Sequence, residues 1–267
     1  MREEALELAR GTDDPSAKLN RLREYLQALV LRSLHDSQAF LDLAFVGGTA
    51  LRFLYNLRRF SEDLDFCLVD DEAYAPEAWL RQLKTRLQQG NLDAGIRWNA
   101  RTAVHKAWIR VPALLQDAGL SPLREQNLSI KLEIDTRPPA GAKLDRTLVN
   151  RHRLLALQHY DRPSLMAGKL HALLCRDYTK GRDWYDLLWY RAGPYPVEPN
   201  LPLLQNALDQ TEGRGTRDAA SWKRLLRKKV SDLDLDKVAL DIAPFLELPE
   251  ERSLFEKDNL LSTLREQ

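Results

Sequence analysis

FVGGTALRFLYNLRRFSEDLDFCL, residues 45–68, is the stretch that decides the fold we predict for this chain. An apolar run leads into Gly47 and Gly48, and a later run alternates Asp63 and Asp65 with leucine and phenylalanine. Alternation of this kind is typical of a β-strand with one buried face. Because successive side chains of a strand point to opposite faces, we expect the two aspartates to share one face while their apolar neighbours enter the core.

The aspartate pair predicts a metal site. Two neighbouring carboxylates repel each other unless a cation lies between them. Oxygen ligands of this kind suit Mg²⁺, which one or two carboxylates typically hold together with the phosphates of a substrate. We therefore expect Asp63 and Asp65 to bind Mg²⁺ or Mn²⁺.

The glycine pair predicts a phosphate-binding turn. Gly47 and Gly48 let the backbone turn sharply and bring its N–H groups close to a ligand. Thr49 adds a hydroxyl, and the helix that begins near it offers its positive end to an anion. A phosphate-binding turn followed by an aspartate pair indicates a protein that handles a nucleoside triphosphate (NTP).

Gly48-Thr49, thirteen intervening residues and then Asp63-x-Asp65 resemble the first motif of the polymerase-β-like nucleotidyltransferase superfamily. The fuller string GGTAL…RRFSEDLDF is similar to one branch of it, the AbiEii/AbiGii abortive-infection toxin family. Most of the superfamily has Gly-Ser at the first two positions, and threonine keeps the hydroxyl. The resemblance implies an α/β fold with a small mixed sheet flanked by helices, and a nucleotide site that includes Ser61.

A third carboxylate is expected on a later strand. The run 128–136 alternates strictly, which places Lys131, Glu133 and Asp135 on one face. A site that transfers phosphoryl groups with two metal ions needs such a carboxylate on a neighbouring strand. Asp135 matches the superfamily by position and is our predicted catalytic and metal-binding residue, with Glu133 as the alternative.

A second signature follows a helix that the sequence predicts from Pro163. The pattern K-x-x-A-x-x-x-R, followed by RD-x-YDL, resembles the second motif of the same toxin family. The resemblance implies that Lys169 contacts the triphosphate, that Asp183 lies close to it as a catalytic residue, and that Arg182 also binds the nucleotide. Asp186 falls on the same helix face as Asp183, where we expect it to brace Arg182.

Composition indicates a globular chain. Its 267 residues are 44% hydrophobic and 30% charged, and the net charge of +1 gives no global attraction to nucleic acid. The two cysteines argue against a disulfide scaffold. The N-terminus lacks the features of a signal peptide, and no apolar run approaches the roughly 20 residues of a membrane span. We expect a cytoplasmic protein.

Two regions are predicted, a nucleotidyltransferase domain with N-terminal helices over 1–192 and a helical C-terminal region over 202–267. The proline-dense segment between them reads as a linker. Helical stretches are expected near 202–210, 216–230 and 234–265. The segment 222–229 packs five basic residues into eight, which makes it the candidate for contact with an RNA backbone.

The predicted function is metal-dependent transfer of a nucleoside monophosphate from an NTP to an acceptor hydroxyl. The resemblance implies a toxin of a toxin–antitoxin or phage-defence pair, with a cognate antitoxin as partner and RNA, at the 3′ end of tRNA, as acceptor. Three alternatives remain: a small-molecule acceptor as in antibiotic-modifying enzymes, a protein acceptor, or a binding protein that has lost catalysis.

Overall fold

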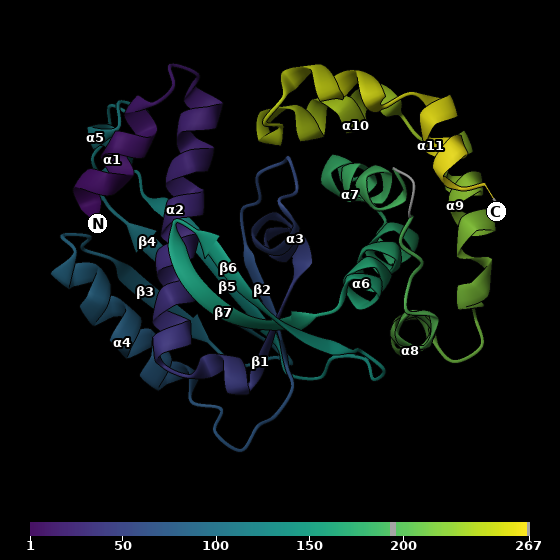
Figure 1. Ribbon diagram of the computed structural model, residues 1–267, viewed down its shortest axis with the longest axis horizontal. Helices are drawn as coiled ribbons and strands as arrows, with labels where there is room; N and C mark the ends of the chain where they lie inside the picture. The colour runs from purple at the N-terminus through teal and green to yellow at the C-terminus, as the bar shows by residue number, and fades with distance from the viewer. Residues whose placement is uncertain (193–195, 266–267) are drawn as a thin grey trace. The chain divides into compact units, whose positions relative to one another are not determined.

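The computed structural model describes residues 1–192 and 196–265 of the chain (Figure 1). The strands are β1 (Leu43–Val46), β2 (Leu64–Leu68), β3 (Gly95–Asn99), β4 (Val104–Val111), β5 (Leu128–Asp135), β6 (Leu144–Arg151) and β7 (Arg153–Tyr160). They form one seven-stranded mixed sheet in the order β3-β4-β5-β2-β1-β7-β6.

Helices surround this sheet or follow it in the chain. The α-helices are α1 (Arg2–Arg10), α2 (Pro15–Asp36), α3 (Gly47–Tyr55), α4 (Pro76–Gln89), α5 (Leu114–Asp117), α6 (Arg162–Cys175), α7 (Gly181–Arg191), α8 (Leu201–Glu212), α9 (Trp222–Ser231), α10 (Leu235–Ile242) and α11 (Lys257–Thr263). The 3-10 helices are η1 (Ala39–Leu41), η2 (Ala219–Ser221), η3 (Ala243–Phe245) and η4 (Pro249–Leu254). A mixed sheet with flanking helices confirms the predicted α/β class.

The chain packs into two compact units. The first comprises Met1–Arg137 and Asp145–His159, and the second comprises Pro138–Leu144 and Tyr160–Gln267. Within the second unit, α6 packs against α8 and α9, and α7 packs against α10 and α11. The predicted linker includes 193–195, which lie outside the described residues. The predicted division into a nucleotidyltransferase domain over 1–192 and a helical region over 202–267 stays a prediction.

The core of the first unit is built on the strand that carries the aspartates. β2 pairs antiparallel with β1 and parallel with β5. Leu64 and Phe66 are 0% and 2% exposed, and the Phe66 ring stacks on Phe45 with 5.3 Å between centroids. In Figure 1, α2 and α4 lie side by side next to the sheet, where α2 contacts β5 and α4 contacts β3. The alternation predicted for this strand is confirmed.

Capping residues and helix breakers set the ends of the helices in the first unit. α2 begins at Pro15, and its cap is the Asp14 carboxylate, which accepts a hydrogen bond of 2.6 Å from the Ala17 N–H. α4 begins at Pro76 and ends before Gly90. β6 was missed, because its sequence LDRTLVNR is polar and mostly exposed and so lacks the strand alternation.

The expectation of one helical stretch over 234–265 is wrong. α10 ends at Ile242, two 3-10 helices follow, and α11 begins at Lys257. Pro244 and Pro249 explain the break, since proline removes a helical hydrogen bond and clashes with the preceding turn. No helix in the described ranges is long and apolar enough to cross a membrane.

Candidate active site

The glycine turn lies directly against the aspartate strand. Gly47 opens α3 with φ of +79°, and in the β1–β2 register Val46 is opposite Asp65. A Cβ atom at Gly47 would overlap the Asp65 carboxylate, and one at Gly48 would lie 2.6 Å from the Arg59 Nη2 atom. Neither position has room for a side chain, so the turn and the carboxylate approach each other as closely as backbone geometry permits.

Thr49 was expected to add its hydroxyl to a phosphate-binding turn, and in the structure this hydroxyl has a backbone partner. Its side chain is fully buried, and its hydroxyl donates a hydrogen bond to the backbone carbonyl of Asp63. The hydroxyl therefore fastens the start of the aspartate strand to α3 in this structure.

The two predicted metal-binding aspartates occupy the beginning of β2. Asp63 directly precedes the strand, Asp65 is its second residue, and both are half-buried. Burial lowers the pKa of Lys131, but Glu133 and then the two aspartates outweigh that effect, so the Lys131 pKa is raised above its ordinary value. The site thus has a negative potential that stabilises a cation.

The strand register decides which carboxylate lies beside Asp65. In the parallel pairing of β2 with β5, Glu133 is opposite Asp65 and Asp135 is opposite Cys67. Glu133 is therefore level with Asp65, whereas the predicted Asp135 lies two residues further along the strand. Two ammonium groups contact the Glu133 carboxylate, Lys131 Nζ at 2.7 Å and Lys106 Nζ at 3.2 Å.

The donor set fits a metal that arrives with a substrate. Within the described residues, no group of three or more His, Cys, Asp or Glu side chains is arranged to hold a metal ion. Asp63 and Asp65 nevertheless supply the one or two carboxylates that Mg²⁺ needs when phosphate oxygens provide further ligands.

The segment that leads into the aspartates is held by side chains rather than by a strand ladder. Five of its carbonyl oxygens accept side-chain hydrogen bonds: Leu57 from Arg52, Phe60 from Arg59, Ser61 and Glu62 from Gln27, and Asp63 from Thr49. Ser61, predicted to bind the nucleotide, belongs to this segment, and its Oγ atom would lie 3.1 Å from a Cβ at Gly48.

Gln27 is a functional candidate that sequence reasoning missed. It lies on α2, is 1% exposed, and its Nε2 atom donates to the carbonyls of Ser61 and Glu62 at 3.0 and 2.9 Å. Buried glutamine requires partners because an unpaired amide in a core costs free energy. The available signal was a glutamine placed between Leu26 and Ala28 in an otherwise apolar stretch of a helix.

The second predicted motif forms a charge cluster in the second unit. Lys169 on α6 lies 3.2 Å from the Asp183 Oδ1 atom and 2.8 Å from the Asp186 Oδ2 atom, both on α7. Arg176 pairs with the other oxygen of Asp183. Burial raises the pKa of Asp183, but Lys169 and Arg176 outweigh it and hold that pKa below its ordinary value. The structure therefore joins Lys169 to Asp183, as the motif implied, and places Asp186 beside the same lysine.

Arg182, predicted to bind the nucleotide, lies next to this cluster. Its guanidinium carbon is 4.1 Å from the centre of the Phe245 ring, within the second unit. That contact is a cation–π interaction, which orients the planar guanidinium group.

The predicted basic surface of α9 is mostly engaged within the protein. Lys223 pairs with a glutamate, while Arg227 and Lys229 donate to backbone carbonyls. Arg224 and Lys228 are the exposed members of the set. The expectation of one five-residue surface for RNA is therefore not supported by the packing, because three of its cations have internal partners.

Comparison with known proteins identifies the family. A family model described as nucleotidyl transferase AbiEii toxin, type IV toxin–antitoxin system, matches residues 29–259. The chain belongs to the AbiEii family. As an AbiEii-family protein it is a nucleotidyltransferase and the toxin of a type IV toxin–antitoxin system, which implies an NTP substrate and an antitoxin partner. The predicted resemblance and enzyme class are confirmed.

Three solved structures share the fold of this AbiEii-family toxin. MenT4, a nucleotidyltransferase toxin of Mycobacterium tuberculosis H37Rv, is 21% identical, with 100% of this chain and 99% of that one covered and a TM-score of 0.54. A putative nucleotidyltransferase from H. pylori is 19% identical, with 91% of each chain covered and a TM-score of 0.52. JHP933 from Helicobacter pylori is 20% identical, with 91% and 88% covered and a TM-score of 0.50. No curated protein matches the chain.

Proposed function

We propose that this AbiEii-family toxin transfers a nucleoside monophosphate from an NTP to a hydroxyl of RNA, at the 3′ end of tRNA, in the presence of Mg²⁺. The observation that carries this proposal is the contact between the glycine turn and the aspartate strand. Gly47 leaves no space between its backbone and the Asp65 carboxylate. A phosphate on the turn and a cation on the carboxylate would then be immediate neighbours.

The reaction balances without a further reactant. The acceptor oxygen forms a bond to the α-phosphorus as the bond from that phosphorus to the α–β bridging oxygen breaks, and pyrophosphate leaves. The proton of the acceptor hydroxyl passes to a carboxylate of the site or to water. Mg²⁺ bound by Asp63 and Asp65 would supply Lewis-acid stabilisation of the phosphate charge.

The protein's own groups have distinct roles in this proposal. The backbone N–H groups of Gly47 and Gly48 orient the phosphates, as at other helix N-termini. We assign the third carboxylate to Glu133 rather than to Asp135, because Glu133 is level with Asp65 in the strand register.

Two basic residues of the second unit are assigned to the NTP. Lys169 is a compact ammonium group suited to phosphate oxygens, and Arg182 offers a planar fork of donors. The paired carboxylates of Asp183 and Asp186 hold the Lys169 ammonium in place. We assign Asp183 a catalytic role through this lysine.

The proposal also includes a protein partner and an RNA acceptor. The AbiEii family implies an antitoxin, and we propose a cognate antitoxin protein as the partner. The tRNA 3′ end follows from the sequence resemblance to the toxin branch of the superfamily.

The test is incubation with each α-labelled NTP, Mg²⁺ and total RNA, followed by denaturing electrophoresis. We expect label in an RNA band of tRNA size, abolished by Asp65→Asn and unaffected by Asp93→Asn, which changes an exposed aspartate of the same unit. Label that stays at wild-type level in the Asp65 variant would disprove the metal assignment. Label on a small molecule or on protein, with none on RNA, would replace the proposed acceptor.

A further inference from the structure

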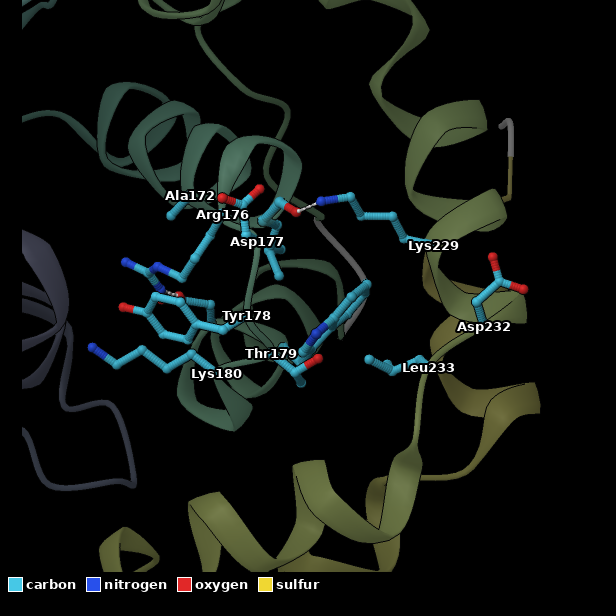
Figure 2. Close-up of a pocket in the computed structure, with 12 residues that line it drawn as sticks. Ala172, Arg176, Asp177, Tyr178, Thr179, Lys180, Lys229, Asp232 and Leu233 are labelled. Atoms are coloured by element: carbon cyan, nitrogen blue, oxygen red, sulfur yellow. Dashed lines mark hydrogen bonds and ion pairs between the residues drawn. The ribbon is translucent and has the colours of Figure 1, made fainter. Parts of the chain in front are cut away.

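Tyr178 occupies the middle of the loop 176–180, which joins α6 to α7 (Figure 2). Its side chain is 63% exposed, and among the aromatic residues of the described ranges it alone is largely exposed. The loop connects the two helices that carry Lys169 and Asp183. A single exposed apolar side chain is common on protein surfaces, so it is the charged groups beside the ring that indicate a binding surface.

The ring is supported on one side by a cation. The guanidinium carbon of Arg176 lies 5.1 Å from the centre of the Tyr178 ring, and Arg176 is itself held by its ion pair with Asp183. In Figure 2 the side chains of Arg176, Tyr178 and Lys180 extend in the same direction from the loop. The cation–π contact pre-orients the ring, which stays largely exposed.

Among the described residues, Lys180 has no ion-pair partner. It is half-buried, and no carboxylate of the described chain lies within ion-pair distance of its ammonium group. Burial and then the neighbouring Arg182 lower the pKa of Lys180, and the Asp183 carboxylate offsets part of that effect. An anion beside Lys180 would relieve this repulsion.

A small cavity adjoins the loop. Its volume is about 220 Å³, and its walls include Thr179, Trp184 and Lys229. Lys229 donates to the carbonyls of Leu173 and Leu174 at 2.8 and 2.7 Å, which offsets the negative end of α6 (Figure 2). Pockets for whole small molecules typically measure roughly 300–1,000 Å³. This cavity is smaller, so it suits one base or sugar of a longer chain.

We infer that Tyr178, Arg176 and Lys180 bind one nucleotide of the RNA acceptor. The base stacks on the face of the Tyr178 ring opposite Arg176, and the Lys180 ammonium contacts an adjacent phosphate. An aromatic platform next to a cation is how proteins bind single-stranded nucleic acid. The inference rests on the proposed function, since it takes RNA as the acceptor.

The test compares variants of the full-length toxin. Fluorescence anisotropy measures the affinity of each variant for a tRNA acceptor-end oligonucleotide over a range of salt concentrations. Tyr178→Ala is expected to raise Kd about 5- to 150-fold, while Tyr178→Phe and Tyr178→Trp keep it within about threefold, because base stacking contributes roughly 1–3 kcal/mol. Lys180→Gln is expected to reduce the slope of log Kd against log salt by about 0.7. Leu254→Ala and Lys237→Gln, at exposed positions of the same unit, are controls expected to change neither quantity.

Binding of the labelled NTP in the absence of RNA separates the outcomes. The inference expects wild-type NTP affinity in the Tyr178 and Lys180 variants. Reduced NTP affinity with unchanged RNA affinity would overturn it and make Tyr178 part of the nucleotide site. If both variants keep the wild-type RNA affinity and salt slope, the inference is overturned. RNA labelling by the wild type would then still uphold the proposed function. Failure of the wild type to label or bind RNA would remove the proposed acceptor and this inference together.

Discussion

Replacing Gln27 by leucine is expected to loosen the segment that leads into the aspartate pair. Gln27 is 1% exposed and donates to two consecutive carbonyls, those of Ser61 and Glu62, at 3.0 and 2.9 Å. Leucine has a similar size and no donor, so the change removes the hydrogen bonds and leaves the packing volume nearly intact. The next residue in the chain is Asp63, which we assign to the metal.

The size of the effect follows from the two lost hydrogen bonds. A hydrogen bond between neutral groups contributes roughly 0.5–1.5 kcal/mol, so the free energy of unfolding should fall by about 1–3 kcal/mol. The effect on the reaction should be larger, since a displacement of about 1 Å in a catalytic group costs up to 100-fold in rate. We expect kcat/KM to fall about 10- to 100-fold and the half-saturating Mn²⁺ concentration to rise.

Three measurements are combined: urea unfolding, single-turnover nucleotidyl transfer, and Mn²⁺ binding in the presence of NTP. Electron paramagnetic resonance detects the bound Mn²⁺. Ser33→Ala is the matched control, because Ser33 is also buried on α2 and its hydroxyl has no hydrogen-bond partner in the part of the chain described. The control should leave transfer and Mn²⁺ binding unchanged. Gln27→Leu with wild-type Mn²⁺ affinity and a kcat/KM within twofold of wild type would refute the positioning role.

Three other changes test the site and its support. Gly47→Ala should abolish transfer and lower the free energy of unfolding by at least about 1–2 kcal/mol, which is the cost of a positive φ for alanine. Gly168→Ala is the control, because a Cβ there meets nothing within 4 Å. In urea unfolding it should be neutral or stabilising by up to about 1 kcal/mol. Glu133→Gln should lower the single-turnover rate at least about 100-fold and Asp135→Asn less than about fivefold, and the reverse order would return the third carboxylate to Asp135. Burial raises the pKa of Glu24, but its histidine and arginine partners bring it down to about 2. The lowered pKa stabilises the fold by about 3 kcal/mol above a pH of about 4.3, and this stabilisation is lost as the pH falls toward 2. The free energy of unfolding of Glu24→Gln, measured at pH 7, 5, 4 and 3, should therefore fall less toward low pH than that of the wild type.

Short sequence patterns predicted those features of the structure that depend on neighbouring residues in the chain. The alternation of charged and apolar residues in 63–68 predicted a strand with the aspartates on one face, because side-chain direction in a strand repeats every two residues. The start of α2 is also set locally, because the Asp14 cap and Pro15 are neighbours in the chain. The enzyme class came from the family resemblance, which depends on the identities and the spacing of the residues in the two motifs.

The sequence by itself determined the aspartate strand, the glycine turn and the enzyme family. Tertiary structure decided which distant groups meet. Gln27 contacts Ser61 across 34 residues of chain, and the β2–β5 register places Glu133 rather than Asp135 opposite Asp65. Packing also gave three cations of α9 partners within the protein, while contact of α9 with RNA stays a prediction. Periodicity tells which face of an element a side chain occupies, but only the packing of one element on another fixes what that face touches.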